Sequence, residues 1–293
     1  MHNLTRRIVC LAMTGTLALA GLAGCGGQGG LVAKEPSSAA ELAEMNEKTA
    51  GTHNYHFEGD FDININVMGQ AFPIKATVGG DYADGNTHIT SVMDIIGQKQ
   101  ENEMYIVKEG DSYVQYSSSK TDDKTQWSKM PIGANPTDSF SSKELLSAGE
   151  FSKDGDNYTI SLTGAQVWDA IVRSDKDLEN ALKDVNTADL RQSLENCKVA
   201  YTFDKAANNT SQTLNIDYSA KSEFAGQPIE MSIKVAGDIK LSNHGKVDAS
   251  KVAVPEGVKS SAVDATAGLN DLLKQLESLT GTQTTTATAQ SAA

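Results

Sequence analysis

The side chains best suited to catalysis or metal binding are scattered along this sequence rather than grouped in a known motif. No Gly-x-Ser-x-Gly elbow, phosphate-binding glycine loop, His-Glu-x-x-His pair or dinucleotide fingerprint occurs. His53 and His56 lie three residues apart at an expected helix-to-strand junction, whereas His88 and His244 stand alone. Folding would have to gather such residues into a site, so we expect no catalytic residue, no metal site and no cofactor.

Three weaker chemical patterns have simpler structural interpretations. The segment from Asp154 begins like a calcium loop, but its twelfth position is Ala165, where a bidentate glutamate is needed, so a turn is expected. Cys197 is expected to be a buried, inert thiol, with a reactive thiol or a link between two copies of the chain as the alternatives. A row of oxygen-bearing residues falls on one strand face, about 7 Å apart, and predicts a solvated surface: Asp60, Asp62, Asn64 and Asn66.

The strongest chemical signal is Cys25, which ends the sequence Leu22-Ala23-Gly24-Cys25. An apolar segment from Ile8 to Ala20 precedes it and is introduced by Arg6 and Arg7. Thirteen residues are too few to cross a hydrocarbon core of about 30 Å as a helix. They fit the apolar region of a secretory signal, and Ala23 and Gly24 are small enough for a signal peptidase.

Together these residues resemble the lipobox of bacterial lipoproteins. The resemblance implies that residues 1–24 are a signal peptide and that Cys25 becomes an amino terminus carrying a thioether-linked diacylglycerol. Two acyl chains anchor a protein stably, whereas one does so only marginally. We therefore expect an exported protein held at the outer face of the cell membrane. An ordinary signal peptide with an incidental Cys25, giving a freely secreted protein, is the alternative.

Charge limits the partners of this protein. The chain has 25 basic and 38 acidic residues. Removal of Arg6 and Arg7 with the signal leaves a formal charge of 23 minus 38, or −15. Such a surface repels nucleic acids and anionic headgroups, so no nucleic-acid partner is expected and membrane attachment depends on the lipid. With Cys10 removed and Cys25 acylated, no intramolecular disulfide can form, and a monomer is the expected state.

The ends of the mature chain differ from its centre. Residues 25–37 are glycine-rich and predict a flexible tether. Ser38 and Glu41 form a capping box that starts a helix ending near Gly51. Residues 263–279 predict an amphipathic helix with leucines at helical spacing, and residues 280–293 predict a disordered tail.

Between these ends, residues 38–262 predict one domain dominated by strands. From Tyr55 to Val67 apolar and polar residues alternate without a break, which predicts a long strand with one dry face. Similar runs separated by turns continue to about residue 113, and others follow at 157–162, 199–203, 214–218, 229–235 and 239–241. Thr163 and Gln166 cap an inserted helical region. One-sided burial is typical of antiparallel sheets, so the expected fold class is α+β, with helices on the concave face of a strongly curved sheet.

The chain also resembles a known superfamily in the order of these features. A lipobox, a short helix before Tyr55-His56-Phe57-Glu58-Gly59, a meander of long strands, and a late segment from Ile239 to Gly245 followed by Val254-Pro255 are similar to the LolA-like superfamily, including carriers of the LprG/LppX type. The resemblance covers residues 38–262. It implies a half-open barrel whose interior holds the acyl chains of a lipid or other amphiphile in the cell envelope.

The residues expected to line such an interior share the dry face or the opposing helix. A gap is expected near Gly59 and Ala76, which are small residues among large ones. If the helices close fully, the same side chains form only a core, and the protein is then a surface module that binds a protein or envelope polymer. A weaker third hypothesis is an accessory hydrolase. The candidate lining residues are Phe57, Phe61, Ile63, Ile65, Phe72, Ile74, Val78, Trp168 and Ile171.

Overall fold

The computed structural model describes residues 35–49, 54–121, 124–132, 143–174, 191–192, 194–224 and 227–265. Twelve strands form one sheet in the order β12-β6-β5-β4-β3-β2-β1-β11-β10-β9-β8-β7, and all neighbours are antiparallel except β12 and β6. The first six strands are β1 (Asn54–Val67), β2 (Gln70–Ala83), β3 (Asn86–Ile95), β4 (Gln98–Glu109), β5 (Ser112–Thr121) and β6 (Lys124–Ile132). The others are β7 (Glu150–Asp154), β8 (Asn157–Thr163), β9 (Lys198–Phe203), β10 (Asn209–Phe224), β11 (Gln227–Ser242) and β12 (Val263–Asp264).

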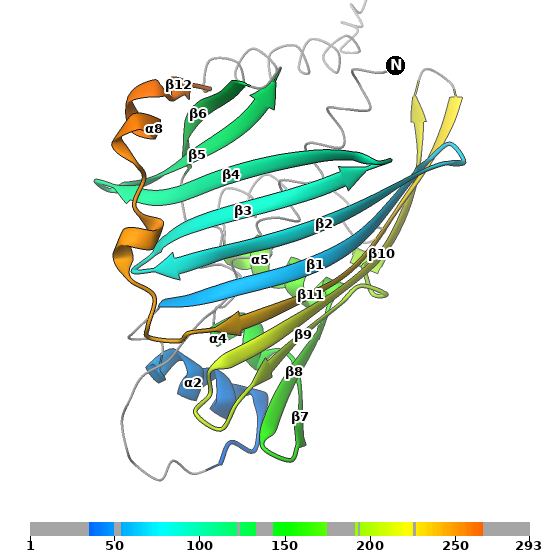
Figure 1. Ribbon diagram of the computed structural model, residues 1–293. Coiled ribbons are helices and arrows are strands. Elements are labelled where there is room, and N and C mark those ends of the chain that lie inside the picture. The colour runs from blue at the N-terminus through cyan, green and yellow to red at the C-terminus, as the bar shows by residue number, and fades with distance from the viewer. Residues whose placement is uncertain are drawn as a thin grey trace, which may run out of the picture.

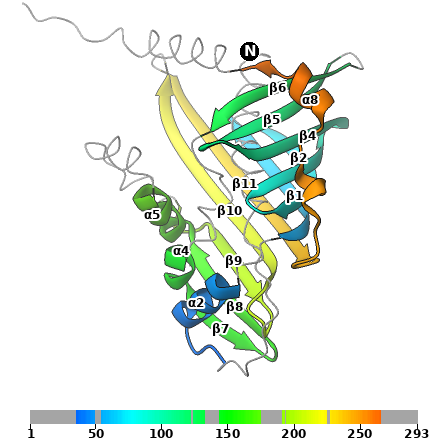
Figure 2. The same ribbon diagram turned by 90° about the vertical axis from the view of Figure 1, so that its left-hand side faces the viewer.

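The sheet is strongly curved and does not close, which confirms the expected α+β half-open architecture (Figure 1). Three helices, α2 (Ala39–Thr49), α4 (Lys143–Ser147) and α5 (Gly164–Ser174), lie on its concave side (Figure 2). Among the described residues, no helix combines the length and apolar content that crossing a bilayer requires.

Strand β1 is the centre of the fold, because it pairs along its length with β2 on one side and with β11 on the other. Its odd-numbered residues from Tyr55 to Ile65 are buried, and Glu58, Asp60, Asp62 and Asn64 are exposed. The predicted alternation is therefore confirmed. It places every second side chain of β1 on the concave face.

Two glycines beside β1 make room for its aromatic rings. Phe57 pairs with Gly80 of β2, and Phe61 pairs with Gly237 of β11. A methyl group at either glycine would overlap the ring of its partner. Each ring therefore lies over a bare stretch of backbone, which is how aromatic residues compensate for glycine in strands.

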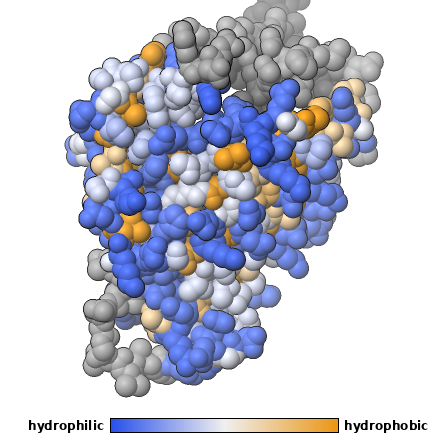
Figure 3. Space-filling model, in the orientation of Figure 1, coloured by the Kyte–Doolittle hydropathy of each residue, from blue (hydrophilic) through white to orange (hydrophobic). Residues whose placement is uncertain are grey.

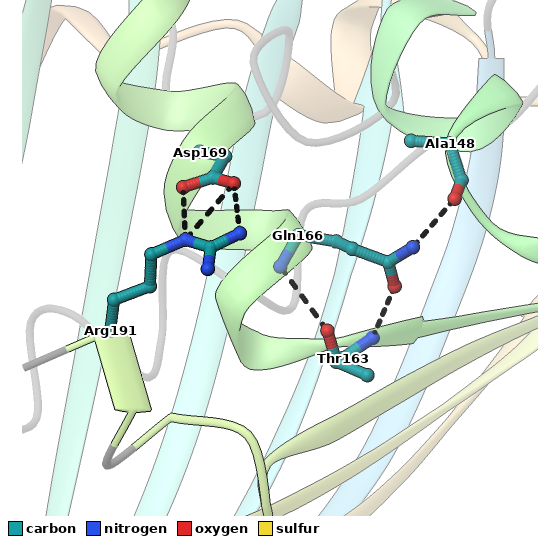
Figure 4. Close-up of polar contacts among 5 residues, drawn as sticks. All are labelled: Ala148, Thr163, Gln166, Asp169 and Arg191. Carbon is teal, nitrogen blue, oxygen red and sulfur yellow. Dashed lines mark hydrogen bonds and ion pairs between the residues drawn. The ribbon is translucent and has the colours of Figure 1, made fainter. Parts of the chain in front are cut away.

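Capping contacts begin the helices where the sequence predicts them. The backbone N–H of Glu41 donates to Ser38 Oγ at 3.2 Å, although the Glu41 carboxylate accepts from Ser37 rather than from Ser38. At α5, the Thr163 N–H donates to Gln166 Oε1 at 2.8 Å and the Gln166 N–H donates to Thr163 Oγ1 at 3.3 Å (Figure 4). Gln166 Nε2 also donates to the Ala148 carbonyl, so it fixes α5 against the end of α4.

The C-terminal part of the described chain crosses the convex face instead of continuing as a helix. The 3-10 helix η3 (Ala249–Val252) and α8 (Glu256–Ser261) lead to β12 (Figure 1). Val254 and Val258 pack on Tyr105 and Tyr116. The predicted helix at 263–279 is wrong at its start, because Val263 and Asp264 pair with the exposed edge of β6. Its remainder from residue 266, and the predicted tail, lie outside the described residues.

Three hairpins turn in two residues with positive φ at both positions, as type I′ turns require. They are Met68-Gly69 (54° and 79°), Asp84-Gly85 (51° and 82°) and Ile96-Gly97 (53° and 80°). Asparagine, aspartate and glycine are the usual residues here, and a bulky or β-branched residue costs about 1 kcal/mol or more. Asp84 follows the rule, and Met68 and Ile96 do not.

The close fit between Phe57 and Gly80 predicts a sharp difference between two adjacent glycines. Gly80→Ala should lower the free energy of unfolding by about 2 kcal/mol or more, because the added methyl group overlaps Phe57 and the His88 carbonyl. Gly79→Ala is the matched control, since its methyl group would lie 3.7 Å from the nearest atom, the Phe57 carbonyl oxygen. Urea unfolding of both variants measures the effect, and equal stabilities would contradict this packing.

Candidate functional site

The structure gathers the predicted lining residues of β1 and β2 into one apolar cluster on the concave face. Six of them are at most 8% exposed, and Phe72 is partly buried against the same cluster. From α5, Val167 packs against this cluster and Trp168 is half-buried. Ile171 belongs to α5, but its side chain lies outside the described residues. The six are Phe57, Phe61, Ile63, Ile65, Ile74 and Val78.

The helices cover this cluster at the end where β1 begins, which we call the α2 end. Leu42 and Ala43 of α2 and Leu145 and Leu146 of α4 are at most 1% exposed and belong to the same cluster. The Asn46 side chain donates to the carbonyl of Ala207 in the β9–β10 turn at 2.8 Å. Helix α2 is thereby fixed to the edge of the sheet from which β1 and β10 start.

Burial of the concave face decreases toward the opposite edge, where β1 turns into β2 and β3 into β4; we call this the hairpin end. On each of five neighbouring strands the apolar residues become half-buried as this edge is approached. The face itself remains apolar, because these residues pair with one another across the strands or with buried isoleucines and valines. The half-buried residues are Val67, Phe72, Ile95, Ile216, Ile233 and Met231.

The gap expected near Gly59 and Ala76 is not found there. A methyl group at Gly59 would meet the Asp238 carbonyl oxygen at 2.9 Å and Ile239 Cγ1 at 3.0 Å, and Ala76 is 6% exposed. Neighbouring backbone and side chains fill the space that these small residues leave. The incompletely covered part of the face therefore lies nearer the hairpin end, around Phe72, which is four residues from Ala76 along β2, and Ile233 of β11.

Buried polar groups occur at the α2 end of the interior. Asn209 is fully buried at the start of β10, and neither of its amide atoms has a hydrogen-bond partner among the described residues. His244 follows β11, and burial lowers the pKa of its ring, so it is neutral at pH 7. Unpaired buried amides are costly. The two ends of the interior thus differ in chemistry, with buried polar groups near α2 and mostly apolar half-buried groups, beside Tyr218, at the hairpin end.

The histidines and carboxylates that the sequence scatters meet on the convex face. His56 Nδ1 lies 2.9 Å from Asp81 Oδ1, and His88 Nε2 lies 2.9 Å from Glu103 Oε1. Burial lowers the pKa of His56, but hydrogen bonds to Asp81 and Glu58 outweigh it and raise the pKa above 6.5. In the described part of the chain, no three His, Cys, Asp or Glu side chains are arranged to hold a metal ion. His53 lies outside that part.

Two other chemical candidates have the structures that the sequence predicts. Asp154-Gly155-Asp156-Asn157 is the tight turn of the β7–β8 hairpin, with Gly155 at a φ of 57°. Cys197 is 4% exposed, and burial raises the pKa of its thiol. The thiol is therefore protonated and shielded at pH 7, as an inert cysteine should be.

The tether is shorter than predicted. Pro36 is buried, Ser37 donates two hydrogen bonds to Glu41, and the Glu35 carboxylate pairs with Lys153 at 2.5 Å. These contacts fix residues 35–37 to the α2 end, so the prediction of a flexible segment up to residue 37 is wrong at its last three positions. Cys25 and the rest of the tether lie outside the described residues.

Comparisons with known proteins show a distant similarity to solved structures, without a match in sequence. No protein-family model matches the sequence, and no curated protein matches it. Among solved structures, a DUF1329 family protein from Desulfovibrio piger ATCC 29098 matches over 70% of this chain and 90% of its own length, with 10% sequence identity and a TM-score of 0.27. A similarity at this level carries no functional argument.

Proposed function

We propose that this protein is a lipid-anchored, non-enzymatic envelope protein of LolA-like type that binds an amphiphile along its concave face. The observation that supports the proposal is the burial gradient. The face is apolar from Phe57 to Phe72, and the described helices complete its cover at the α2 end but not at the hairpin end. Apolar side chains left half-covered on a concave surface are what an acyl chain would bury.

The expected binding energy agrees with such a ligand. Each methylene removed from water contributes about 0.8 kcal/mol, so about eight methylenes along the hairpin end would contribute roughly 6 kcal/mol. An amphiphile meets this requirement with its acyl part at the hairpin end.

One observation favours the alternative of a packed interaction module. Phe57, Phe61 and Ile74 are at most 5% exposed, so this part of the interior is a packed core with its own helices as cover. If the hairpin end is also filled by the chain itself, the convex face becomes the functional surface. That face is largely hydrophilic (Figure 3). Ligand analysis of the purified protein separates these two functions.

The anchor is tested through Cys25. Cys25→Ser should abolish incorporation of radiolabelled palmitate and release the protein from the membrane fraction. The reason is that the described residues include no helix that could span a bilayer in place of the lipid anchor. Cys197→Ser is the control and should leave both properties unchanged, since that thiol is buried in the body. Unchanged labelling and location in Cys25→Ser would contradict the lipoprotein assignment.

The ligand site is tested at the half-buried part of the face. Phe72→Asp should reduce the amount of copurifying amphiphile roughly tenfold or more, because it places a carboxylate on the apolar surface. Ala71→Asp is the matched control, since Ala71 is the adjacent, exposed residue on the opposite face. Organic extraction and native mass spectrometry measure the ligand, and urea unfolding verifies that both variants are folded. Equal ligand in both folded variants, or none in the unchanged protein, would refute carriage by this face.

A further inference from the structure

Two of the turns at the hairpin end, β1–β2 and β3–β4, expose apolar residues where turn chemistry favours polar ones. Met68 is 66% exposed and Ile96 is 67% exposed, and both have positive φ. The third turn of the same type, Asp84-Gly85, lies at the opposite edge, between β2 and β3, and carries the expected aspartate (Figure 1). The unfavourable residues therefore occur at one edge of the sheet and are not a general property of its turns.

The two apolar turns are also built alike. Asn66 Oδ1 accepts from the Gly69 N–H at 3.0 Å, and Asp94 Oδ1 accepts from the Gly97 N–H at 2.7 Å. In each turn a side chain two positions before the apolar residue holds the backbone in its left-handed conformation. These contacts keep Met68 and Ile96 projecting from the ends of rigid hairpins, without any burial in the body to offset the backbone cost.

The charge at these tips differs from that of the whole protein. Residues 66–70 contain no ionisable side chain, and Asp94 in residues 94–99 is balanced by Lys99. The two tips together are neutral, whereas the mature chain is expected to carry −15. An anionic lipid surface repels most of this protein, whereas the two tips carry no net charge of their own; the nearest acidic residue on the adjoining strand is Glu230, whose carbonyl accepts from the Met68 N–H at 2.9 Å.

The tips are continuous with the concave face. Val67 precedes Met68 and pairs with Met231, and Ile95 precedes Ile96 and pairs with Ile74. The half-buried residues of the candidate site thus begin directly behind the exposed tips. An acyl chain leaving a membrane beside Met68 and Ile96 would reach the apolar face without crossing a polar surface.

From these observations we infer that the tips of the β1–β2 and β3–β4 hairpins form a membrane-docking rim, which inserts Met68 and Ile96 into the lipid interface where the amphiphile enters. This inference rests on the proposed function for the ligand, and it adds the surface through which that ligand is exchanged. The partner is a phospholipid bilayer surface, because neutral tips with isolated apolar residues suit the interface between headgroups and acyl chains.

The tether allows the rim to touch the membrane only if the sheet is inclined to the membrane plane. The ten residue-to-residue steps from Cys25 to Glu35 reach at most about 35 Å, and Glu35 is fixed at the α2 end. The 13 steps of β1, from Asn54 to Val67, span about 44 Å between the two ends. The α2 end can therefore rise up to about 35 Å above the membrane while the rim touches it, which inclines β1 by at most about 50° to the membrane plane.

A thiol-attached probe tests the rim, because Cys25 is acylated in the proposed state and Cys197 is buried. Met68→Cys, Ile96→Cys and the matched Asp84→Cys are each labelled with an environment-sensitive fluorophore in the full mature protein. The proteins are reconstituted in phosphatidylcholine vesicles containing some phosphatidylglycerol. Nitroxide-labelled lipid should quench the probe at positions 68 and 96 at least about threefold more than at position 84.

Equal quenching at all three positions would overturn the inference. A probe at position 68 or 96 that is shielded from aqueous iodide but not quenched by the nitroxide lipid would also overturn it, since that result indicates contact with a protein. The double variant Met68→Asn with Ile96→Asn provides a second test. It should fold, because asparagine accepts a positive φ. This variant should take up amphiphile from vesicles several-fold more slowly while retaining the ligand already bound. Bound amphiphile with no probe insertion refutes the rim alone, and probe insertion with no amphiphile refutes the proposed carrier function alone.

Discussion

The central constraint on this fold is the burial of one face of β1 while the strand is hydrogen-bonded on both edges. Its register with β2 and β11 sets Phe57 over Gly80 and Phe61 over Gly237, and these contacts leave no freedom for a one-residue shift. A shift would expose the whole apolar set and bury Asp60 and Asp62. The long neighbouring strands, the curvature and the concave apolar face all follow from this arrangement.

That arrangement also explains why the interior is covered unevenly. The strands β1, β2, β10 and β11 are 14 to 16 residues long, whereas α2 and α5 have 11 residues each and α4 has five. A helix advances less than half as far per residue as a strand, so the described helices cannot follow these strands to their far end. The half-buried side chains around Phe72 and Ile233 are the result, and they are the basis of the proposed binding function.

Local sequence signals predict the parts of this fold that depend on local physics. The alternation in β1, the capping box at Thr163 and the turn at Gly155 are confirmed, and of the capping box at Ser38 the bond to the Glu41 N–H is present. Strand β11 is different, because we expected a break between residues 235 and 239. The break is absent because Gly237 keeps the two-residue period, and the ring of Phe61, 176 residues earlier in the chain, replaces its missing side chain.

The sequence predicts the candidate site in outline but not its position. It identifies the residues of the dry face, yet it places the gap at Gly59, where the backbone of β11 comes close enough to fill the space. The extent of helical cover depends on tertiary packing, and no local pattern contains it. For the same reason the sequence does not predict the short strand at Val263 and Asp264. These two exposed residues are extended because they pair with the edge of β6.

The central claim is that an amphiphile completes the cover of the hairpin end. The most direct measurement uses the protein with isotope-labelled isoleucine methyl groups and its unlabelled copurified ligand, and records nuclear Overhauser effects between the two. The account predicts contacts from acyl protons to the methyl groups of Ile95, Ile216 and Ile233, and none to the fully buried Ile160 beneath the α2 end. A ligand-free protein in which these three methyl groups contact only other residues of the chain would contradict it.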